Sequence, residues 1–468
     1  MPELPEVETV KNVLLPIVKN RTVIKCEVLR KTIVNNLSDE FISFILNETF
    51  LDISRRGKFL IFHLTNDKVL ISHLRMEGKY YELDESEENT KYSRAVFHLD
   101  NGHKLCYDDS RSFGRMIMSN ETNYLKEKEI AKLGPEPFEI DDVSTLVKQC
   151  KKISLPIKTA LLNQTLMTGL GNIYVDEVLF ASKIHPLTPT KFINKNEWEN
   201  IVKEAKRILS MAIKDGGSTI KSYHPGKDIS GEFQTKLLAY GRNGQMCVSR
   251  HAFMRFIKVN GRGTTYCPKC QIKRGAPIKI AIVGKIASGK STALDVFKKA
   301  NYLALSSDEI VHNLYAKKDI QELVNKRLKI KSDLPFVDAL REHLKSHQKD
   351  LDRLEKIIHP LVKKEIEKEF KNSKSPLLVC EVPLLFKAHM QNMFDVIIGV
   401  DISNSEQLKR LQIRDKEKSA FLKRINDDNN YFEEHRLDLD YIVTNNNDVK
   451  SLSKEVKKII NIILDRLY

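Results

Sequence analysis

The stretch that decides the organisation of this chain contains Cys267-Pro-Lys-Cys270, the polar spacer Gln271–Pro277, the apolar run Ile278–Val283 and Gly284-Lys-Ile-Ala-Ser-Gly289-Lys290-Ser291. A Cys-x-x-Cys pair is typical of a metal-binding finger. The glycine-rich segment, placed between a predicted strand and a predicted helix, is typical of a loop whose backbone amides bind nucleotide phosphates. Neither motif belongs to the other's fold. The sequence therefore predicts two different enzymes joined near Arg274–Pro277.

The composition is that of soluble, folded domains. With 468 residues, of which 41% are hydrophobic and 30% charged, the chain is long enough for three or four packed units. No apolar run approaches the roughly 18 residues that a membrane span needs. The first residues, Met-Pro-Glu-Leu-Pro-Glu, lack the basic and then apolar layout of a signal peptide. We expect a cytoplasmic monomer that does not use a membrane.

Positive charge is concentrated in one part of the chain. The formal net charge is +15, to which residues 1–150 contribute about −4, residues 151–276 about +13 and the remaining residues about +6. A basic block of that size fits a polyanionic partner such as DNA. It also fits a lysine-rich surface in contact with water, so charge alone leaves both interpretations open.

The pattern up to residue 273 predicts strands, then helices, then a finger. Val7–Val18 is predicted as an opening helix, and five runs have strand character: Thr22–Leu29, Phe59–Leu64, Val69–His73, Ala95–His98 and Lys104–Tyr107. Helical periodicity begins near Val143 and includes Glu197–Ile213. We predict a β-sandwich at 1–135, a helical domain at 136–240 and a β-hairpin finger at 241–273.

Strands and helices alternate from residue 277 onward. Apolar strands are predicted at Ile278–Val283, Pro376–Val382, Val396–Asp401 and Tyr441–Asn445, with helical stretches between them. Such alternation is typical of a parallel α/β sheet. We therefore predict a multidomain chain that ends in an α/β P-loop domain at 277–468.

Pro2 and Glu3 are candidates for covalent chemistry at the start of the chain. Removal of Met1 would make Pro2 a secondary amine whose lone pair can attack an electrophilic sugar carbon. The neighbouring carboxylate of Glu3 could protonate the opening sugar or shuttle protons. Many proteins begin with Met-Pro-Glu, so these residues need support from the rest of the sequence.

That support comes from the order of four motifs. These are Met1-Pro-Glu-Leu-Pro-Glu-Val-Glu-Thr-Val10, Arg55-Arg-Gly-Lys58, Leu161-Leu-Asn-Gln-Thr-Leu-Met-Thr-Gly-Leu-Gly-Asn-Ile-Tyr-Val-Asp-Glu177, and Gly261-Arg-Gly-Thr264 ahead of the Cys-x-x-Cys pair. Over residues 1 to about 273 the chain resembles the formamidopyrimidine-DNA glycosylase family. At Leu4 the chain resembles the branch of this family that acts on oxidised purines. The resemblance implies that 136–240 is a helix-two-turn-helix DNA-binding domain and 241–273 a zinc-finger-like hairpin.

The resemblance also implies catalytic roles. Pro2 would be the Schiff-base nucleophile and Glu3 the proton donor at the sugar. Lys58 would assist at the abasic-site phosphates and in β-elimination, although it could also be an ordinary exposed lysine. Arg262 would hold a phosphate and serve δ-elimination. The implied substrate is damaged double-stranded DNA.

Removing a base requires turning it out of the duplex, so the gap must be filled. By the resemblance, Met76, Arg111 and Phe113 are the residues that enter the duplex, although Ser112 departs from the usual family pattern. Met76 could instead fill the core.

Phosphate contacts are expected around Thr168-Gly-Leu-Gly-Asn172, where two glycines allow a tight turn and expose backbone amides. Asn172 and Lys158 are further candidates for phosphate contacts. Ser218–Gly231 matches the lesion-recognition loop of the family by position alone, so no residue is assigned there.

The finger has an incomplete set of cysteines. A structural zinc ion usually has four ligands from two Cys-x-x-Cys pairs. Cys267 and Cys270 form one pair, but Arg250 stands where the partner of Cys247 is expected, and His251 follows it. We predict zinc held by Cys247, His251, Cys267 and Cys270. A finger without zinc, or with weakly bound zinc, is the alternative.

Five motifs mark the second half: the phosphate loop, Ser306-Ser-Asp308-Glu-Ile310, Ile358-His-Pro360, Glu381-Val-Pro-Leu-Leu-Phe386 and Arg410-Leu-Gln-Ile-Arg414-Asp415. Together they resemble dephospho-coenzyme-A kinase. The resemblance implies that Asp308 is the general base for the ribose 3′-hydroxyl of dephospho-coenzyme A; a helix N-cap is the alternative. ATP and its magnesium ion would be bound by Gly284, Gly289, Lys290, Ser291, Thr292 and Arg414.

Some positions depart from the kinase pattern. Ser306 replaces an aspartate, Lys285 a glycine, and Glu381 and Lys387 replace the residues that usually flank Pro-Leu-Leu-Phe. We predict a bifunctional enzyme that excises oxidised purines such as 8-oxoguanine, nicks the abasic strand, and phosphorylates dephospho-coenzyme A in the last step of coenzyme A biosynthesis. The alternatives are a kinase for another nucleotide-like acceptor, a degenerate kinase module beside an active glycosylase, and a DNA-binding protein without catalysis.

Overall fold

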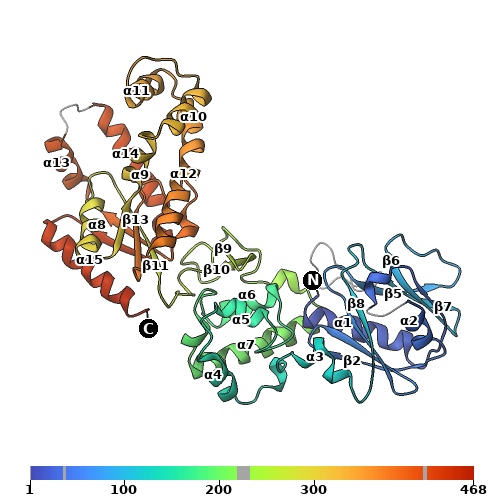
Figure 1. Cartoon of the computed structure of the whole chain (residues 1–468). Helices are drawn as coiled ribbons and strands as arrows, with labels where there is room; N and C mark the ends of the chain where they lie inside the picture. The colour runs from blue at the N-terminus through green and yellow to red at the C-terminus, as the bar shows by residue number, and fades with distance from the viewer. Residues whose placement is uncertain (1, 35–37, 219–231, 415–418, 468) are drawn as a thin grey trace. The chain divides into compact units, whose positions relative to one another are not determined.

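The computed structural model describes residues 2–34, 38–218, 232–414 and 419–467, without side chains at 413, 414 and 419–424. The chain divides into two compact units (Figure 1). Unit 1 comprises Met1–Val248 and Phe256–Gln271, and unit 2 comprises Ser249–Arg255 and Ile272–Tyr468. The division lies beside the junction that the sequence singled out. The finer division into four domains stays a prediction.

Two four-stranded sheets begin unit 1. Their strand orders are β1-β6-β7-β5 and β2-β3-β4-β8, and the paired strands run antiparallel. The strands are β1 (Val23–Val28), β2 (Phe50–Arg56), β3 (Phe59–Leu64), β4 (Lys68–His73), β5 (Lys79–Asp84), β6 (Ser93–Leu99), β7 (His103–Asp108) and β8 (Arg115–Asn120). Side chains of both sheets share one apolar core with helix α1 (Leu4–Val18). The predicted β-sandwich is confirmed.

Strand β3 shows how sequence alternation becomes two layers. Successive side chains of a strand point to opposite faces. Leu60, Phe62 and Leu64 enter the sandwich core. Phe59 and Ile61 enter a smaller cluster that includes Ile130 of α3 (Lys128–Ala131). Because both faces are buried, the run is uniformly apolar and was predicted with its correct bounds.

Three strands of the sandwich, β2, β5 and β8, carry no clear strand signal. In β2 only Phe50 and Ile53 are buried, and β5 and β8 begin or end with charged or polar residues. Their positions are decided by pairing with neighbouring strands. Helix α1 begins at Leu4, three residues before the predicted start, because the side chains of Glu3 and Glu6 form a capping box around its first turn.

A helical domain and a hairpin complete unit 1. The helices are α4 (Ser144–Cys150), α5 (Ile157–Leu162), α6 (Asn172–Ala181) and α7 (Lys195–Lys214). Helix α7 buries one stripe at helical spacing, with Trp198 fully buried at the centre of the core. Strands β9 (Arg255–Val259) and β10 (Arg262–Tyr266) form the hairpin. Asn260 and Gly261 between them both have positive φ, as a tight two-residue hairpin turn requires.

Unit 2 is built on a five-stranded parallel sheet of order β12-β13-β11-β14-β15. The strands are β11 (Ile278–Gly284), β12 (Leu303–Ser306), β13 (Leu377–Glu381), β14 (Val396–Asp401) and β15 (Tyr441–Thr444). Helices α8 (Lys290–Lys299) and α15 (Val449–Leu464) share a core with one face of the sheet. Helices α9 (Ser307–Tyr315), α10 (Lys318–Leu328) and α12 (Asp350–Asn372) share a core with the other face (Figure 1). The predicted α/β fold is confirmed.

The remaining helices are α2 (Ser38–Ile45), α11 (Phe336–Ser346), α13 (Asn404–Arg414) and α14 (Ser419–Glu434). Short 3-10 turns lie at Lys31–Ile33, Tyr124–Lys126, Pro137–Glu139, Thr190–Phe192, Phe233–Lys236, Gln391–Met393 and Arg436–Asp438. Across the described residues, every helix is too short or too polar to span a bilayer.

Two candidate active sites

The first candidate site is centred on Glu3. Its side chain is only 2% exposed and lies at the N-terminus of α6. The carboxylate accepts hydrogen bonds from the backbone amides of Gly171 at 2.5 Å, Ile173 at 2.9 Å and Tyr174 at 3.3 Å. Because the first amides of a helix have no partner within it, a carboxylate is stabilised there. Helix α6 is far from Glu3 in the sequence, yet its first amides hold the Glu3 carboxylate in place. Pro2, the residue before Glu3, is also buried.

Burial changes the acid–base behaviour of this site. Burial raises the pKa of Glu3, against the opposing charge of Lys58. Burial also lowers the pKa of Lys58, whose Nζ donates to the Leu170 carbonyl at 2.8 Å. Lys58 is 6% exposed, so it is not the ordinary surface lysine of the alternative interpretation. Glu3 therefore keeps its proton to higher pH, and the Lys58 ammonium group loses its proton at lower pH, than either would in water. Such a pair suits proton transfer near neutral pH.

Two glycines are required where the α5–α6 turn meets the start of the chain. A Cβ on Gly171 would lie 2.3 Å from Cδ of Glu3. Gly169 has a φ of +95°, which disfavours residues other than glycine, and its carbonyl accepts a hydrogen bond from the Leu4 amide at 3.0 Å. The two glycines of Gly169-Leu-Gly171 thus allow the backbone of this turn to lie close to the start of the chain at Glu3.

Glu6 also belongs to this site, although it was not among the residues predicted from the sequence. Its carboxylate accepts hydrogen bonds from the Glu3 amide at 2.8 Å, the Tyr174 hydroxyl at 2.6 Å and the Ser218 amide at 2.8 Å. Its place in the Pro-Glu-Leu-Pro-Glu motif was the available signal. Ser218 is the last described residue before 219–231, so the rest of the predicted lesion-recognition loop lies outside the described residues.

Arg262 begins β10 and is exposed. Its charge contributes to lowering the pKa of Lys58, which places the two cations in one electrostatic environment. The finger hairpin therefore brings a cation into the electrostatic range of Lys58; that Arg262 binds a phosphate stays a prediction.

Lys158 and Asn172 have partners inside the protein. The Lys158 side chain is fully buried, and Nζ donates to Asp176 Oδ1 at 2.7 Å and to the Gly263 carbonyl at 3.0 Å. Asn172 Nδ2 donates to the same carbonyl at 3.1 Å. In this conformation the Lys158 amine is enclosed and is not presented to a phosphate, in contrast to the sequence interpretation.

The three residues predicted to enter the duplex lie on two neighbouring turns. Met76 is half-buried in the turn between β4 and β5. Arg111 and Phe113 are exposed between β7 and β8, with 54% of Phe113 accessible. Glu77 links the turns, because its Oε1 lies 3.0 Å from Arg111 Nε. An exposed phenylalanine beside an arginine is suited to inserting into a base stack.

Asp109 shapes the turn that displays Arg111 and Phe113. Its buried carboxylate accepts hydrogen bonds from the Arg111 amide at 3.0 Å and the Gly114 amide at 2.7 Å. Ser112 has φ of +53°, and its hydroxyl accepts a hydrogen bond from Arg94 Nε at 2.8 Å. The departure from the family pattern at Ser112 is thus accommodated in an ordered turn.

The finger brings four possible zinc ligands together. One ligand atom from each of Cys247, His251, Cys267 and Cys270 lies within 4.8 Å of the others. Three thiols and an imidazole are a donor set that zinc accepts, so the residues fit the ion. Arg250 has φ of +52°, and this left-handed residue carries the chain past the expected cysteine position to His251.

The second candidate site is the phosphate loop between β11 and α8. Lys290 begins α8, and its Nζ donates to the carbonyls of Gly284 and Lys285, both at 3.0 Å. Gly289 precedes it in the left-handed region, where an added Cβ would lie 2.5 Å from Asn445 Nδ2. Asn445 in turn donates to the Ser288 carbonyl at 2.7 Å. The loop is therefore held in shape by the segment after β15.

Glu381 joins this site from the end of β13. Ser291 Oγ donates to Glu381 Oε1 at 3.4 Å. Burial raises the pKa of Glu381, Lys290 opposes the shift, and the charge of Asp308 adds to it. In the sequence, Glu381 stands where the kinase family usually has another residue. The structure places this carboxylate beside Ser291 and in the electrostatic range of Asp308.

Asp308 lies in the first turn of α9 and is exposed. The N-cap of α9 is Ser306, whose hydroxyl accepts a hydrogen bond from the Glu309 amide at 3.4 Å. The departure at Ser306 therefore has a capping role. Asp308 is not the N-cap, which leaves its carboxylate available for the role of a base. Thr292, the third residue of α8, is half-buried.

The side chain of Lys285, a residue of the phosphate loop, pairs with carboxylates outside the loop. It is 7% exposed, and its Nζ lies 2.8 Å from Asp401 Oδ1 and 3.2 Å from Glu433 Oε1. The amine also lies 5.3 Å from the ring centre of Phe432. Its charge is thus balanced within unit 2, and the glycine-to-lysine departure adds little positive charge at the phosphates.

Of the two arginines in the motif Arg410–Asp415, the structure describes the side chain of Arg410. Arg410 Nη2 donates to the Asn445 carbonyl at 2.9 Å, and Nε lies 3.2 Å from Glu406 Oε1. It therefore braces the segment that supports the phosphate loop. The side chain of Arg414, the predicted lid arginine, lies outside the described residues.

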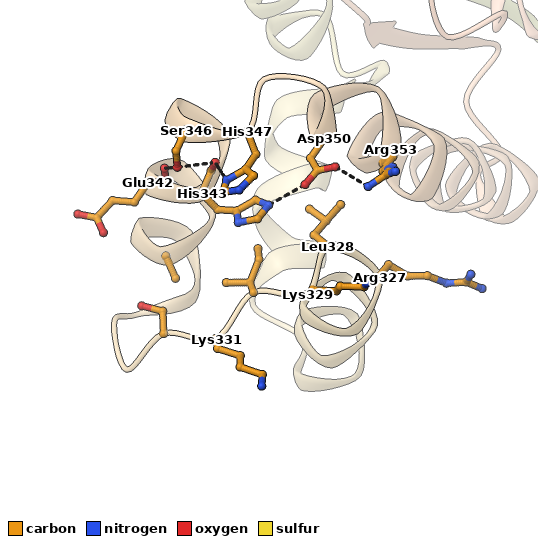
Figure 2. Close-up of a pocket in the computed structure, with 13 residues that line it drawn as sticks. Arg327, Leu328, Lys329, Lys331, Glu342, His343, Ser346, His347, Asp350 and Arg353 are labelled. Atoms are coloured by element: carbon orange, nitrogen blue, oxygen red, sulfur yellow. Dashed lines mark hydrogen bonds and ion pairs between the residues drawn. The ribbon is translucent and has the colours of Figure 1, made fainter.

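A separate cavity of about 560 Å³ lies among α10, α11 and the start of α12 (Figure 2). At its wall, Asp350 accepts hydrogen bonds from His343 Nε2 and Arg353 Nη1, each at 2.8 Å. Figure 2 shows Arg327 and Lys331 extending away from this network. The network joins α11 to α12, and it contains none of the predicted kinase residues.

The two sites define two classes of enzyme. A sandwich, a helical domain and a finger around a buried acid and amine are the architecture of a DNA base-excision glycosylase. A parallel sheet with a phosphate loop is the architecture of a P-loop kinase.

Comparison with known families identifies each class further. Residues 1–116 match the formamidopyrimidine-DNA glycosylase N-terminal domain, and residues 133–224 match the H2TH domain of that glycosylase. Residues 278–451 match dephospho-CoA kinase. The chain belongs to the formamidopyrimidine-DNA glycosylase family and carries a dephospho-CoA kinase domain after it.

Relatives of known sequence and structure cover the first unit. The formamidopyrimidine-DNA glycosylases of Shouchella clausii and Ligilactobacillus salivarius are each 45% identical to this chain, over 274 and 281 residues. These matches cover 58% of this chain and 99% of each relative. The Lactococcus lactis Fpg in complex with an abasic site containing DNA is 38% identical, with a TM-score of 0.54, and the match covers 58% of this chain and 100% of that one. A mutant of the same protein with a Fapy-dG containing DNA gives a TM-score of 0.56.

Proposed function

We propose that residues 2–271 excise oxidised purines from double-stranded DNA and then cleave the abasic strand. The observation that carries this proposal is the Glu3 carboxyl, buried on the N-terminus of α6 beside Lys58 and next to Pro2. The related Lactococcus lactis structures contain DNA with an abasic site or with Fapy-dG, which supports DNA as the substrate.

The proposed chemistry begins at Pro2. Its nitrogen, freed by removal of Met1, attacks C1′ of the damaged nucleotide, and the C1′–N bond to the base breaks with its electron pair leaving on the base. The proton that the Pro2 nitrogen loses neutralises the departing base. Glu3 supplies a proton as the sugar ring opens, which its raised pKa favours. The product is an iminium ion that links Pro2 to C1′.

Two eliminations follow from this iminium ion. It acidifies the proton at C2′, and loss of that proton expels the 3′ phosphate in β-elimination. Loss of the C4′ proton then expels the 5′ phosphate in δ-elimination. Lys58 assists the first step, and Arg262 holds the phosphate in the second. Hydrolysis of the remaining iminium releases the sugar fragment and restores Pro2.

Recognition requires the base to leave the stack. Met76 and Phe113 would fill the gap and unstack the neighbouring bases, and Arg111 would bind the base left without a partner. Asn172 is a proposed phosphate contact. A zinc ion held by Cys247, His251, Cys267 and Cys270 would stabilise the fold of the finger.

Borohydride trapping tests the glycosylase and lyase proposal. Reduction of the iminium ion should link the full-length protein covalently to DNA that contains 8-oxoguanine or an abasic site. A protein that retains Met1 should form no adduct, because Pro2 would lack its free amine. Absence of an adduct with the processed protein would refute the lyase chemistry.

We infer a second activity for unit 2, transfer of the ATP γ-phosphate to the 3′-hydroxyl of dephospho-coenzyme A. The supporting observation is the phosphate loop with Lys290 and Ser291, next to Glu381 and the Asp308 carboxylate. Asp308 would take the hydroxyl proton, the 3′ oxygen would attack the γ-phosphorus, and ADP would leave. Ser291 and Glu381 would hold a magnesium ion, which supplies neutralisation of phosphate charge.

Measurement of ADP release tests this activity. ADP should form from ATP only when dephospho-coenzyme A is present. Release with a different nucleotide-like acceptor would favour the alternative kinase, and the absence of release with every acceptor would favour a degenerate module.

A further inference from the structure

The strand that carries Arg262 is attached to the helical domain by a buried charged pair. Lys158 of α5 and Asp176 of α6 are both fully buried at the side chain, with Nζ and Oδ1 2.7 Å apart. Lys158 also donates to the Gly263 carbonyl at 3.0 Å, and Asp176 Oδ2 accepts from the Thr265 amide at 3.2 Å. The pair therefore binds two backbone groups of β10.

These two backbone groups belong to one edge of the strand. Backbone groups two residues apart in a strand point to the same side. Asn172 Nδ2 adds a third hydrogen bond at that edge, to the Gly263 carbonyl at 3.1 Å. Side chains of α5 and α6 therefore hold β10 along its edge, immediately after Arg262.

A buried ion pair is suited to specifying geometry. Removing two charges from water is costly, and an apolar pair of similar size is often as stable. The pair nevertheless fixes one placement of β10, because each charge needs its own backbone partner. The charge of Arg262 contributes to lowering the pKa of Lys158 as well as that of Lys58. The arginine thus lies in the electrostatic environment of both lysines.

We propose that Lys158 and Asp176 are positioning residues that hold β10 so that Arg262 reaches the 5′ phosphate expelled in δ-elimination. The inference rests on the function proposed above for Arg262. It assigns Lys158 to the support of the finger strand, in place of a direct phosphate contact, and it gives a role to Asp176.

Two variants test the pair in the full-length protein. Asp176→Asn removes one charge and leaves Lys158 buried without a counter-ion. The double variant Lys158→Met with Asp176→Leu replaces the pair by apolar side chains, which buried sites often tolerate. Both variants should lower the ratio of δ- to β-elimination product on abasic DNA about tenfold, because small misplacements of a catalytic group have large effects. Borohydride trapping should change less than about twofold.

Controls separate this inference from the proposed function. Arg262→Ala should lower the same product ratio; if it does not, the role of Arg262 fails. Asp141→Asn removes an exposed partner of Lys206 in the helical domain and should leave the ratio unchanged. Hydrogen exchange at the Thr265 amide measures the attachment of β10 independently of catalysis, and it should accelerate in both variants.

The outcomes decide the inference in either direction. A lower ratio with faster Thr265 exchange supports positioning. An unchanged ratio in both variants while Arg262→Ala lowers it would overturn the inference, as would unchanged Thr265 exchange. A parallel loss of trapping and of both products would show a merely structural role. If Asp176→Asn does not fold, the double variant decides alone.

Discussion

The two candidate sites differ in where their polar groups find partners. At the glycosylase site, the Glu3 carboxylate accepts three amides of the protein, and Lys58 donates to the Leu170 carbonyl. At the kinase site, Lys290 donates to carbonyls of its own loop. The first arrangement holds an acid in place before any substrate arrives. The second must exchange its lysine contacts when phosphates bind.

This difference predicts different responses to substitution. A group held by several backbone amides is positioned by the fold, so its removal affects chemistry directly. A lysine bound to loop carbonyls is positioned by its substrate, so its removal affects nucleotide binding as well as phosphoryl transfer. Since the two activities occur on one chain, each is an internal control for the other.

The largest effect is expected for Glu3→Gln. Without a proton donor, excision of 8-oxoguanine should fall about 10³-fold, within the range for general acid catalysis. Nicking of a preformed abasic site should fall much less, because no base has to leave and the abasic sugar already opens to its aldehyde in water. Single-turnover cleavage assays measure both rates, and ADP release should not change. Equal losses on both substrates would contradict the role of Glu3 in base removal.

Lys290→Met should have the next largest effect. Loss of the phosphate-binding amine should lower ADP release with dephospho-coenzyme A about 10²- to 10³-fold. Borohydride trapping on abasic DNA should be unchanged, because Lys290 lies in the other unit. A decrease below fivefold would mean that the loop does not bind ATP in the proposed way.

The pH dependence sharpens the assignment of Glu3. Burial raises the pKa of this carboxyl above its usual value of 4.5. If the protonated form is active, excision relative to nicking of a preformed abasic site falls as the pH rises through that pKa, about tenfold per pH unit beyond it. The comparison with abasic DNA cancels the ionisation of Pro2. The same ratio should be independent of pH in Glu3→Gln, and a ratio independent of pH in the parent protein would exclude Glu3 as the acid.

Zinc tests the finger. We expect one zinc ion per chain, and His251→Ala should lower its affinity about 10- to 100-fold, with weaker binding to DNA. Arg250→Gly is the matched control, because glycine adopts positive φ without strain, and its zinc content should equal that of the parent. Metal analysis of the purified proteins gives the stoichiometry. A parent protein without zinc would contradict the proposed site.

The smallest effect is expected for Lys285→Met. Because the Lys285 amine pairs with Asp401 and Glu433 inside unit 2, its loss should change the KM for ATP less than about twofold. The unfolding midpoint of unit 2 should fall slightly, since both carboxylates lose one cationic partner and keep Arg436. A large change in KM would show that Lys285 acts on the phosphates after all.

The fold class followed from sequence patterns that burial enforces. Strand β3 was predicted with its correct bounds because both of its faces are buried. Strands β2, β5 and β8 were not predicted, because their exposed positions carry charged or polar side chains that dilute the strand signal. Helix α1 started earlier than predicted, because its first turn is stabilised by Glu3 and Glu6.

The candidate site was predicted unevenly for a related reason. Pro2, Glu3, Lys58 and Lys290 belong to contiguous motifs, so the sequence pointed to them directly. Glu6 and Asp176 act through residues far away in the sequence: Glu6 binds Ser218, and Asp176 binds Thr265. Both residues lie inside motifs that resemble the family, but no local pattern marks their distant partners Ser218 and Thr265. The burial of Lys158 was missed because its partner Asp176 is on another helix.

The sequence by itself determined that two enzymes share this chain and where they are joined, and it predicts which short motifs carry phosphate binding and proton transfer. These features are local, since a glycine-rich loop or a capped helix requires only neighbouring residues. The tertiary structure alone decided which charges are buried, which carbonyls they bind and how strongly their pKa values shift. Those properties depend on distant segments that remove water from a side chain, and the order of residues along the chain does not specify them.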